Sequence, residues 1–569
     1  MHAHGHLSSS TLSAPLMGSL VLHLPLRIAF LSTIFFLLTY QVHPVSLSNL
    51  SHPQLESLCK STPFPSRCFD TLKLSVSINL PNILDLAKQT LQNALSEATK
   101  TTNLVMGLRQ YGLVERERGT IQDCQELHQR TLDFLQSSLK IGNPKPENLN
   151  KIRTLLSAAL TNKNTCFEGL DSASGSIKPT LMSKLNSMYE LVSNSLSMYS
   201  NPSKSQGRQG RRLLEDSGRR KSGFPARFSR KRGFPAWLTG KDRRILQSSP
   251  GDGYDSGDIL IVAKDGSGNY SSIMEAVNAM PNNRLDRFVI FVKEGVYEEN
   301  VEIASNKQNL VMMGDGIDVT VITGSRSVGD GWTTFRSATV AVMGDGFLAR
   351  DITFENTAGP EKHQAAALRV NADISAFFQC SFRGYQDSLY VHSLRQFYRE
   401  CDIYGTIDFI FGNAAVVFQG CSIILRKPME GQFNAITAQS RDIPDESTGM
   451  SIQNCTIEPD SDLASNPGST KNYLGRPWRV YSRTVYLESY IDRLIDPAGW
   501  TKWSGDEGLD TLYYGEYSNY GPGSGTDNRV SWLGFHKMDY SDASNFTVSE
   551  FIDGDNWLVS TSFPYDDGI

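Results

Sequence analysis

The fold is decided by the stretch from Tyr385 to Asn413, which reads YQDSLYVHSLRQFYRECDIYGTIDFIFGN. A repeat runs through it and beyond it, because an aromatic–polar–cysteine block recurs with its cysteine at 380, 401 and 421. The period is therefore 20 to 21 residues. A period in the twenties with β-branched and aromatic runs and Gly and Asn turns predicts a β-solenoid.

Residues one period apart stack in a solenoid, because neighbouring coils are about 4.7–4.9 Å apart. Asp387 and Asp408 are 21 residues apart, so we expect them on adjacent coils with carboxylates roughly 5 Å apart. Gln364 precedes Gln386 by 22 residues and belongs one coil further back. The period thus predicts that three coils present two amides and two carboxylates on one outer face.

Two carboxylates that close cannot both ionise easily, so one pKa rises and the other falls. The pair then offers a neutral acid beside a charged nucleophile or base. The two glutamine amides can donate hydrogen bonds to a developing oxyanion. A turn-capping role would explain a single aspartate, but not the whole set at one-coil spacing.

Five blocks of this sequence resemble the signature blocks of plant pectin methylesterases. They are Gly295-Val-Tyr-Glu-Glu299, Gln364-Ala-Ala-Ala-Leu368, Tyr385-Gln-Asp-Ser-Leu-Tyr390, Asp408-Phe-Ile-Phe-Gly-Asn413 and Tyr473-Leu-Gly-Arg-Pro-Trp478. The resemblance covers about residues 258 to 557. Ala366 and Ser388 stand where the family more often has Val and Thr, and neither change removes a reacting group. The resemblance implies a right-handed parallel β-helix that hydrolyses galacturonate methyl esters in pectin, and we expect no metal and no other cofactor.

The histidines of this half of the chain, His363, His392 and His536, form no Ser-His-Asp set, so we expect a carboxylate nucleophile. We assign that role to Asp408, which would form an acyl-enzyme anhydride. Asp387, held neutral, would protonate departing methanol and then take a proton from water. Gln386 and Gln364 would stabilise the oxyanion.

Four further residues are expected to hold the nucleophile or the substrate. Arg476 follows Asp408 by 68 residues and could keep it ionised and oriented, since Arg stays charged. Trp478 and Tyr390 offer flat faces for sugar rings. Thr334 matches a substrate-contacting position of the family that the chain resembles.

Length and composition predict a multidomain chain that is not a nucleic-acid binder, since it has 569 residues and a net charge of −5. We expect a leader over 1–45, a helical region over 50–200, a basic linker over 201–250 and the solenoid over 255–560. Arg27 precedes an apolar run to Tyr40 that has the length of a signal-peptide core and is short for a membrane span. We therefore expect a monomer secreted to the cell wall, with a signal anchor as the alternative to a cleaved signal peptide.

The helical region has apolar residues at spacings of three and four in stretches at 72–95, 104–113, 121–139, 149–170 and 179–199. Such a pattern predicts an antiparallel helical bundle. The region resembles the pectin methylesterase inhibitor domain. Inhibition of the attached solenoid and a role as an inert folding aid both remain open.

Secretion permits disulfides. Cys59 and Cys68 flank a Pro-rich hairpin, and Cys124 and Cys166 fall on different predicted helices. We expect the disulfides Cys59–Cys68 and Cys124–Cys166, although four cysteines allow three connectivities. In the solenoid we expect a disulfide between Cys401 and Cys421, which lie one coil apart. We expect Cys380 and Cys455 to be free thiols.

The linker is rich in Arg, Lys, Ser, Gly and Pro, a composition that cannot bury a core. Arg211-Arg-Leu-Leu214 and Arg243-Arg-Ile-Leu246 are near-copies and resemble the dibasic processing sites of the same family. We expect a processing protease as a partner here, and a polybasic binding tail is the alternative.

Other readings of the solenoid are a glycosidase, which also uses paired carboxylates, and a lyase, which needs an acidic calcium cluster. Neither explains two glutamines at one-coil spacing. A non-catalytic protein that inhibits other esterases and binds pectin is a third reading, which the intact Asp387, Asp408 and Arg476 disfavour.

Overall fold

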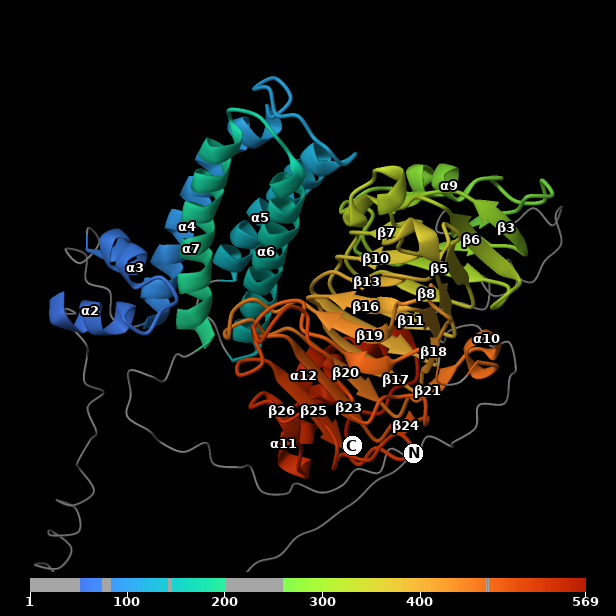
Figure 1. The fold of residues 1–569 in the computed structure, drawn as a ribbon. Coiled ribbons are helices and arrows are strands. Elements are labelled where there is room, and N and C mark those ends of the chain that lie inside the picture. Colours follow the sequence, from blue (N-terminus) through green and yellow to red (C-terminus); the bar gives the residue numbers. More distant parts are fainter. Residues whose placement is uncertain (1–51, 74–82, 142–145, 201–258, 467, 469) are drawn as a thin grey trace, which may run out of the picture.

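The structure is a computed structural model that describes residues 52–73, 83–141, 146–200, 259–466, 468 and 470–569. These residues form a helical bundle that lies against a β-helix (Figure 1). The expected leader, the basic linker and both dibasic sites lie outside the described residues. Within the described ranges, no helix is long and apolar enough to cross a membrane, and no cluster of three metal-ligating side chains occurs.

The bundle is built from four long helices, with two short helices at one end (Figure 1). Their bounds are α2 His52–Cys59, α3 Pro65–Leu72, α4 Ile83–Met106, α5 Thr120–Lys140, α6 Pro146–Ser172 and α7 Lys178–Ser200. The stretch 104–113 is not a helix of its own, because α4 runs to Met106 and the chain then turns, with Gly112 at φ +76°. Positive φ at glycine ends a helix without steric cost.

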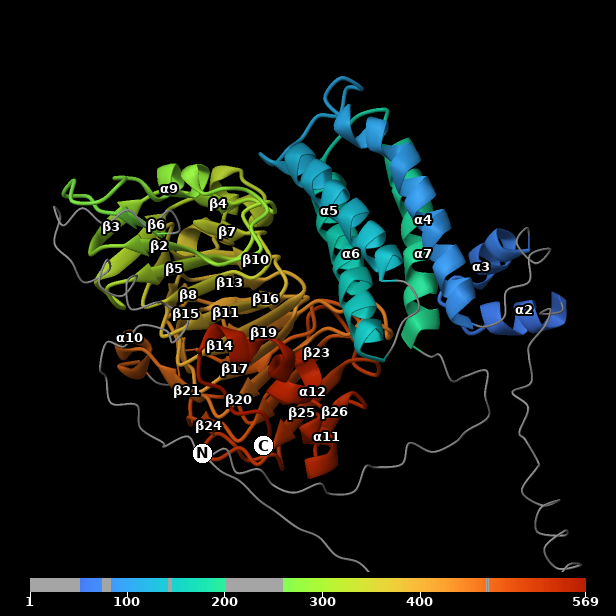
Figure 2. The same ribbon diagram turned by 180° about the vertical axis from the view of Figure 1, so that it is seen from behind.

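Two disulfides hold the bundle together, and both were predicted. Cys59 is bonded to Cys68 beside the hairpin between α2 and α3, and Cys124 is bonded to Cys166 between α5 and α6. The second bond joins the two helices that face the β-helix (Figures 1 and 2).

The β-helix has three parallel sheets that share each coil, as a right-handed parallel β-helix requires. The first sheet has β1 Ile259–Val262, β2 Phe288–Val292, β5 Leu310–Gly314, β8 Leu348–Arg350, β11 Ser375–Phe378, β14 Arg395–Arg399, β17 Ala415–Gln419, β20 Gly449–Gln453, β23 Arg483–Leu487, β25 Tyr513–Tyr517 and β26 Phe535–Lys537. The second has β22 Asn472–Gly475, β19 Asn434–Gln439, β16 Ile407–Gly412, β13 Leu389–Val391, β10 Leu368–Val370, β7 Val340–Val342 and β4 Val301–Ile303. The third has β24 Tyr490–Ile491, β21 Thr456–Pro459, β18 Ser422–Leu425, β15 Asp402–Gly405, β12 Ser381–Arg383, β9 Thr353–Asn356, β6 Thr320–Gly324 and β3 Gly295–Glu298.

The interior of the β-helix is filled by side chains that stack from coil to coil. Phe377, Tyr398 and Phe418 form one such stack, with ring centroids 4.7 and 4.8 Å apart. That spacing equals the distance between neighbouring strands, so the repeat seen in the sequence is the repeat of the core. The helix predicted at 272–280 is α9, Ile273–Ala279, which lies at the first coils (Figure 1).

The bridge expected between Cys401 and Cys421 is wrong, because both residues are free thiols buried inside the β-helix. Cys380 and Cys455 are free and buried, as expected. The four cysteines occupy the same position in successive coils, so their Cα–Cβ bonds run side by side instead of converging as a disulfide requires. Each of the last three thiols instead approaches a backbone carbonyl of the preceding coil, with Cys421 Sγ 3.5 Å from the oxygen of Tyr398.

Short helices complete the β-helix. They are α10 Ser461–Ala464, α11 Tyr540–Ser544, α12 Val548–Ile552, and the 3₁₀ turns η1 Val328–Asp330, η2 Thr334–Arg336, η3 Pro360–Lys362, η4 Gly554–Asn556 and η5 Leu558–Thr561. Val548 and Ile552 of α12 pack on the outer face of the first sheet with Val417 of β17. The C-terminal residues therefore cover a sheet face that would otherwise expose apolar side chains.

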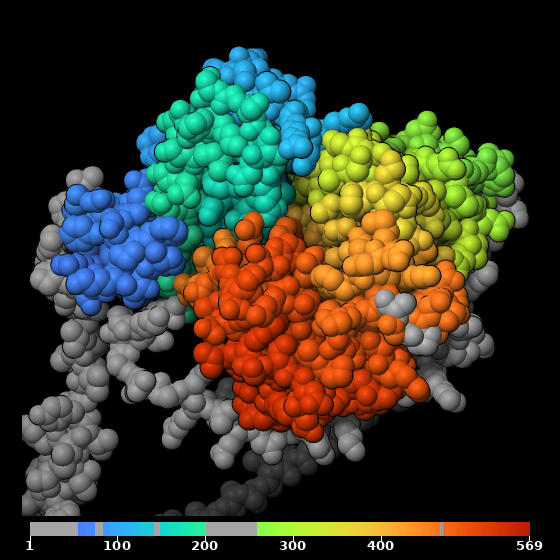
Figure 3. Space-filling view, viewed as in Figure 1, coloured from blue at the N-terminus to red at the C-terminus, as the bar shows by residue number. Residues whose placement is uncertain are grey.

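The bundle docks on the second sheet. Helices α5 and α6 lie next to the β-helix and α4 and α7 lie behind them, as Figures 1 and 2 agree. The surfaces of the two parts meet in the space-filling view of Figure 3. One continuous buried apolar cluster joins bundle residues to Phe335, Tyr390 and Phe411 of the β-helix. The interface is therefore packed like a core, which favours a stable contact.

Candidate active site

Asp387 lies two residues before β13, and Asp408 lies in the neighbouring strand β16 of the second sheet. Leu389 of β13 pairs with Ile410 of β16, which places the two aspartates in the same register. Both adopt left-handed backbone conformations, with φ of 63° and 53°. A register shift next to Asp408 interrupts the pairing of β16 with β19. Such an irregularity re-aims a side chain, and here the aspartates line one cavity.

Arg476 distinguishes the two carboxylates. It follows β22 and pairs with Asp408 through two hydrogen bonds, Nε to Oδ1 at 2.9 Å and Nη2 to Oδ2 at 2.6 Å. Burial and then the negative charge of Asp408 hold the pKa of Asp387 well above its usual value. Burial also raises the pKa of Asp408, so the fall expected from the spacing of the two carboxylates does not occur, although the hydrogen bonds and charge of Arg476 oppose the rise. The proton of the pair therefore resides on Asp387.

The two aspartates line a cavity of about 340 Å³. The structure also brings Gln364, Gln386 and Thr334 to its wall. Tyr390, Arg476 and Trp478 line it as well, so all eight residues selected from the sequence border one space. The backbone N–H of Ala365 donates to the carbonyl of Gln386, which keeps the two glutamines on adjacent coils.

Aromatic rings form one side of this cavity. Tyr390 stacks on Phe411 with centroids 4.1 Å apart, and Trp478 lies 6.0 Å from Phe411. Trp503 stacks with Trp478 at 6.2 Å, and the Arg476 guanidinium lies 4.2 Å from the Trp503 ring. Sequence reasoning missed Trp503 because it comes from a loop after the last coil of the second sheet and shares no repeat position with the other residues.

His392 is a structural residue. It is fully buried, and burial with the positive charge of Arg369 holds its pKa well below the usual value. Its Nδ1 lies 3.0 Å from the Ser393 hydroxyl and its Nε2 lies 3.0 Å from the Thr165 hydroxyl of α6. A neutral imidazole in these contacts only positions its neighbours.

The bundle also borders the cavity, which sequence reasoning did not foresee at the level of residues. Glu117, Asp123, Thr165, Glu168 and Gly169 line it together with the residues of the β-helix. Residues of α5 and α6 therefore border the cavity of the aspartate pair, in keeping with the position of these helices next to the β-helix (Figures 1 and 2).

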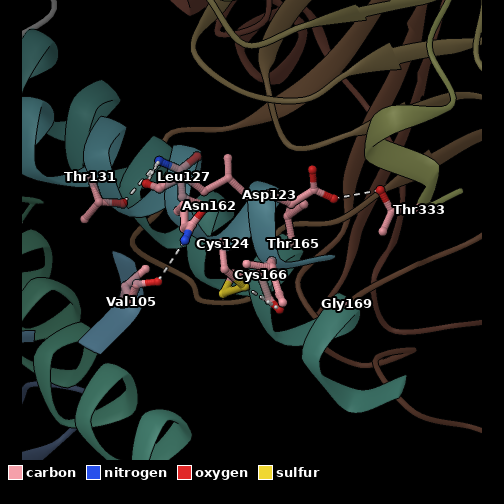
Figure 4. Close-up of a disulfide and its surroundings, with 12 residues drawn as sticks. Val105, Asp123, Cys124, Leu127, Thr131, Asn162, Thr165, Cys166, Gly169 and Thr333 are labelled. Atoms are coloured by element: carbon pink, nitrogen blue, oxygen red, sulfur yellow. Dashed lines mark hydrogen bonds between the residues drawn. A yellow bond between two sulfur atoms is a disulfide. The ribbon is translucent and has the colours of Figure 1, made fainter. Parts of the chain in front are cut away.

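Polar contacts fix this arrangement. The Thr333 hydroxyl donates to Asp123 Oδ2 at 2.7 Å, and Figure 4 shows Asp123 reaching from α5 beside Cys124 toward Thr333. Arg479 donates to Glu168 of α6. Asn413 Nδ2 donates to the Thr161 hydroxyl at 2.9 Å. Charged and neutral hydrogen bonds thus join both docking helices to the wall of the cavity.

Comparisons with known proteins agree with this geometry. Residues 259–555 match the Pectinesterase family, and residues 53–198 match the family described as plant invertase/pectin methylesterase inhibitor. A probable pectinesterase/pectinesterase inhibitor from Arabidopsis thaliana is 56% identical over 95% of this chain and 99% of its own length. A pectinesterase from Citrus sinensis is 45% identical, and the match covers 94% of this chain and 98% of the length of the Citrus protein.

Among solved structures, a pectin methylesterase from carrot is 54% identical, with a TM-score of 0.54. The match covers 55% of this chain and 98% of the carrot chain, so the carrot protein corresponds to the β-helix. A parallel β-helix with a buried aspartate pair under a helical bundle defines a carboxylic ester hydrolase with an inhibitor-type domain. The chain belongs to the pectinesterase family, whose members de-esterify pectin.

Proposed function

We propose that the chain hydrolyses galacturonate methyl esters of cell-wall pectin with Asp408 as the nucleophile and Asp387 as the acid and base. One observation carries the assignment of roles: Arg476 pairs with Asp408 through two hydrogen bonds, while burial beside that charge favours the protonated form of Asp387. An ionised carboxylate can attack a carbonyl carbon, and a neutral carboxyl can donate a proton.

In the first step an oxygen of Asp408 bonds to the ester carbonyl carbon. The bond from that carbon to the methoxy oxygen breaks, and the proton of Asp387 moves to the methoxy oxygen, which leaves as methanol. Gln364 and Gln386, on the wall of the same cavity, donate hydrogen bonds to the carbonyl oxygen while it carries negative charge. The product is an anhydride between Asp408 and the galacturonate.

In the second step Asp387, now ionised, takes a proton from water as the water oxygen bonds to the galacturonyl carbon of the anhydride. The bond between that carbon and the Asp408 oxygen breaks, which restores the Asp408 carboxylate beside Arg476. The galacturonate leaves as a free acid, and Asp387 is protonated again for the next cycle.

The test of the activity is methanol release from esterified pectin by residues 247–569, alone and with the helical region added back. We expect release by the β-helix alone, because the carrot relative shows that this fold stands without a bundle. We expect the added helical region to suppress it, since α5 and α6 border the cavity of the aspartates. Absence of methanol from the β-helix would overturn the assignment.

The two glutamines provide a separate prediction. Gln364→Ala or Gln386→Ala should each lower kcat by roughly 10²–10³, by analogy with removal of one oxyanion donor. KM should change little, because the interaction forms mainly in the transition state. Steady-state methanol kinetics with the β-helix alone measure both constants.

Gln432→Ala is the matched control, because Gln432 lies in a loop and its side chain accepts a hydrogen bond from the backbone of Met429. The control should leave kcat within about twofold of the parent. A rise in KM with unchanged kcat for either cavity glutamine would assign it to ground-state binding instead.

We further propose that the bundle, within the helical region 50–200, keeps the solenoid over 255–560 inactive until a protease cuts the basic linker. The helices border the cavity and share a buried cluster with Tyr390 and Phe411, so a polymer cannot reach the aspartates while they stay in place. The two disulfides of the bundle suit an oxidising compartment, which supports secretion to the cell wall. We assign processing to the dibasic sites, and the protein acts as a monomer.

The docked state should be stronger in acid. Burial raises the pKa of Asp123 to about 6, against the opposing effects of Arg336 and Thr333, and Glu126 raises it further. Burial also raises the pKa values of Glu168 and Asp345, which Arg479 and Arg130 oppose. We expect Asp123 and Glu168, which belong to the bundle and face the β-helix, to regain ordinary pKa values when undocked, so that docking takes up protons.

Because the pKa of Asp123 is higher in the docked chain than in the undocked chain, docking is strongest at pH values below the undocked pKa. Docking then weakens as the pH rises toward the docked pKa of about 6. From Asp123 alone we expect a loss of up to roughly tenfold in docking affinity per pH unit between 4 and 6. The measurement is the ratio of methanol release by uncut and cut chain at pH 4.5 and 6.5. Asp123→Asn should flatten this dependence, and an equal ratio at both pH values in the parent would contradict it.

A further inference from the structure

We propose that Thr333 and Arg336, backed by Arg369, form a subsite for the ionised carboxylate of a galacturonate that has already lost its methyl ester. In the uncut chain the bundle fills this subsite with its own carboxylates, Asp123 and Glu126. The inference rests on the proposed function and adds to it a recognition site for the de-esterified polymer.

The carboxylate of Asp123 occupies the subsite with both oxygens engaged. The Thr333 hydroxyl donates to Oδ2 at 2.7 Å, and Arg336 Nε donates to Oδ1 at 2.6 Å. Arg336 Nη2 donates to Glu126 of the same helix. Figure 4 shows the Asp123 carboxylate reaching away from its own helix toward Thr333. This is the pattern in which a protein holds a carboxylate, since a guanidinium supplies donors in a fixed fork.

The subsite adjoins the catalytic cavity through Thr333. Thr333 and Asp123 line the same cavity as Asp387 and Asp408. Arg369 of β10 pairs in register with Tyr390 of β13, which is on the strand next to β16. At about 4.8 Å per strand, the subsite is offset by one strand from Asp387 and by two strands, roughly 10 Å, from Asp408. It therefore receives another sugar of the same polymer, not the ester that reacts.

The charges of the β-helix at this place do not balance without the bundle. With the bundle docked, Arg336 and Arg369 are both buried, with 4% and 1% of their surface exposed. The β-helix offers them Glu302, which lies 3.6 Å from Arg336 and is 42% exposed. Two cations then face one partly solvated carboxylate.

Two guanidinium nitrogens of this cluster also make no hydrogen bond in the docked chain, although Arg336 Nη1 lies 3.6 Å from Glu302. Arg336 Nη1 and Arg369 Nε are buried without a hydrogen-bond acceptor. Burial lowers the pKa of Arg369 to about 10, which reflects a poorly compensated charge. Arg369 has the hydrogen bond to Asn371 and a 4.0 Å approach to Glu126. A carboxylate of the substrate would supply the missing negative charge and acceptors.

The bundle thus fits the groove as a chemical mimic of de-esterified pectin at pH values above the raised pKa of Asp123, about 6, where that carboxyl is ionised. Substrate would compete with α5 for Arg336, and a partly de-esterified polymer would compete better than a fully esterified one. The subsite also predicts that the acid produced by one turnover helps to hold the polymer for the next.

The test uses the β-helix, residues 259–569, whose carrot relative folds without a bundle. Arg336→Gln is compared with the parent and with Arg383→Gln, a control on β12 of the third sheet whose side chain pairs with Asp318. The probe is a fully de-esterified hexagalacturonate, added as an inhibitor of methanol release from a fully methyl-esterified hexamer.

We expect competitive inhibition of the parent and of Arg383→Gln. In Arg336→Gln the inhibition constant should rise roughly 10- to 100-fold, the range for loss of a charged hydrogen bond. The kcat on the fully esterified hexamer should stay within about twofold. Arg336→Lys keeps the positive charge but loses the forked guanidinium donors, so its inhibition constant should be intermediate. If Arg336→Gln does not fold, Arg336→Lys is the variant that tests the subsite.

An inhibition constant that is unchanged in Arg336→Gln or Arg336→Lys would overturn the subsite. So would an equal rise in Arg383→Gln, or a loss of kcat on the esterified hexamer as large as the change in inhibition. A parent β-helix that releases no methanol would instead overturn the proposed function, so the two failures are distinguishable.

Discussion

Asp408→Asn should lower the rate of methanol release by roughly 10³–10⁵, because removal of one member of a concerted catalytic set usually costs several orders of magnitude. The amide cannot attack the ester carbonyl, and it also loses the charge that pairs with Arg476. Asn is the appropriate replacement, since it tolerates the left-handed backbone of this position, φ 53°. The measurement is kcat of the cut chain on esterified pectin.

Asp387→Asn should show a comparable loss, because the amide at this position can neither protonate methanol nor accept a proton from water. The double variant should be hardly worse than either single one, since the two groups act as a unit. Thermal unfolding midpoints close to that of the parent would show that the fold is kept. Near-normal turnover in either single variant would remove that residue from the mechanism.

Cutting the chain between 201 and 258 should raise the rate by roughly two to three orders of magnitude. While the chain is intact, the bundle is tethered at an effective concentration on the order of 1 mM. A contact with a dissociation constant of about 1 µM would then leave about one molecule in a thousand open. The interface contains a continuous buried apolar cluster and the Arg479–Glu168 ion pair, both of which favour such a contact.

A specific protease site inserted into the linker provides the experiment, with a scrambled insertion of equal length as the control. Methanol release is measured before cutting, after cutting, and after removal of the bundle by chromatography. Glu168→Ala should raise the rate of the uncut chain, because it removes the partner of Arg479. Equal rates for the uncut and the separated chain would assign the bundle to folding alone.

The sequence predicted the β-helix because its period is the physical period of the core. Asp387 and Asp408 could be placed on neighbouring coils from a 21-residue spacing alone, and the structure has Leu389 opposite Ile410. The same period led to the wrong prediction of a Cys401–Cys421 disulfide. Side chains at equal positions in successive coils stack side by side and do not converge as a disulfide requires.

What the sequence could not predict lies where the chain leaves the repeat. Trp503 comes from a loop, and Asp123 and Thr165 come from a different domain, so no spacing connects them with the aspartates. Docking depends on shape and on pairs such as Asp123 with Arg336, which are 213 residues apart. Amphipathic periodicity predicts which helices form, but not which helix faces an external partner.

We propose that an aspartate pair on the β-helix hydrolyses methyl esters, and one measurement tests this role most directly. Methanol and new reducing ends are counted in the same sample of esterified pectin, treated with the cut parent chain or with its Asp408→Asn variant. The parent should release methanol without new reducing ends, and the variant should release almost none. New reducing ends in place of methanol, or methanol release that survives Asp408→Asn, would contradict the account.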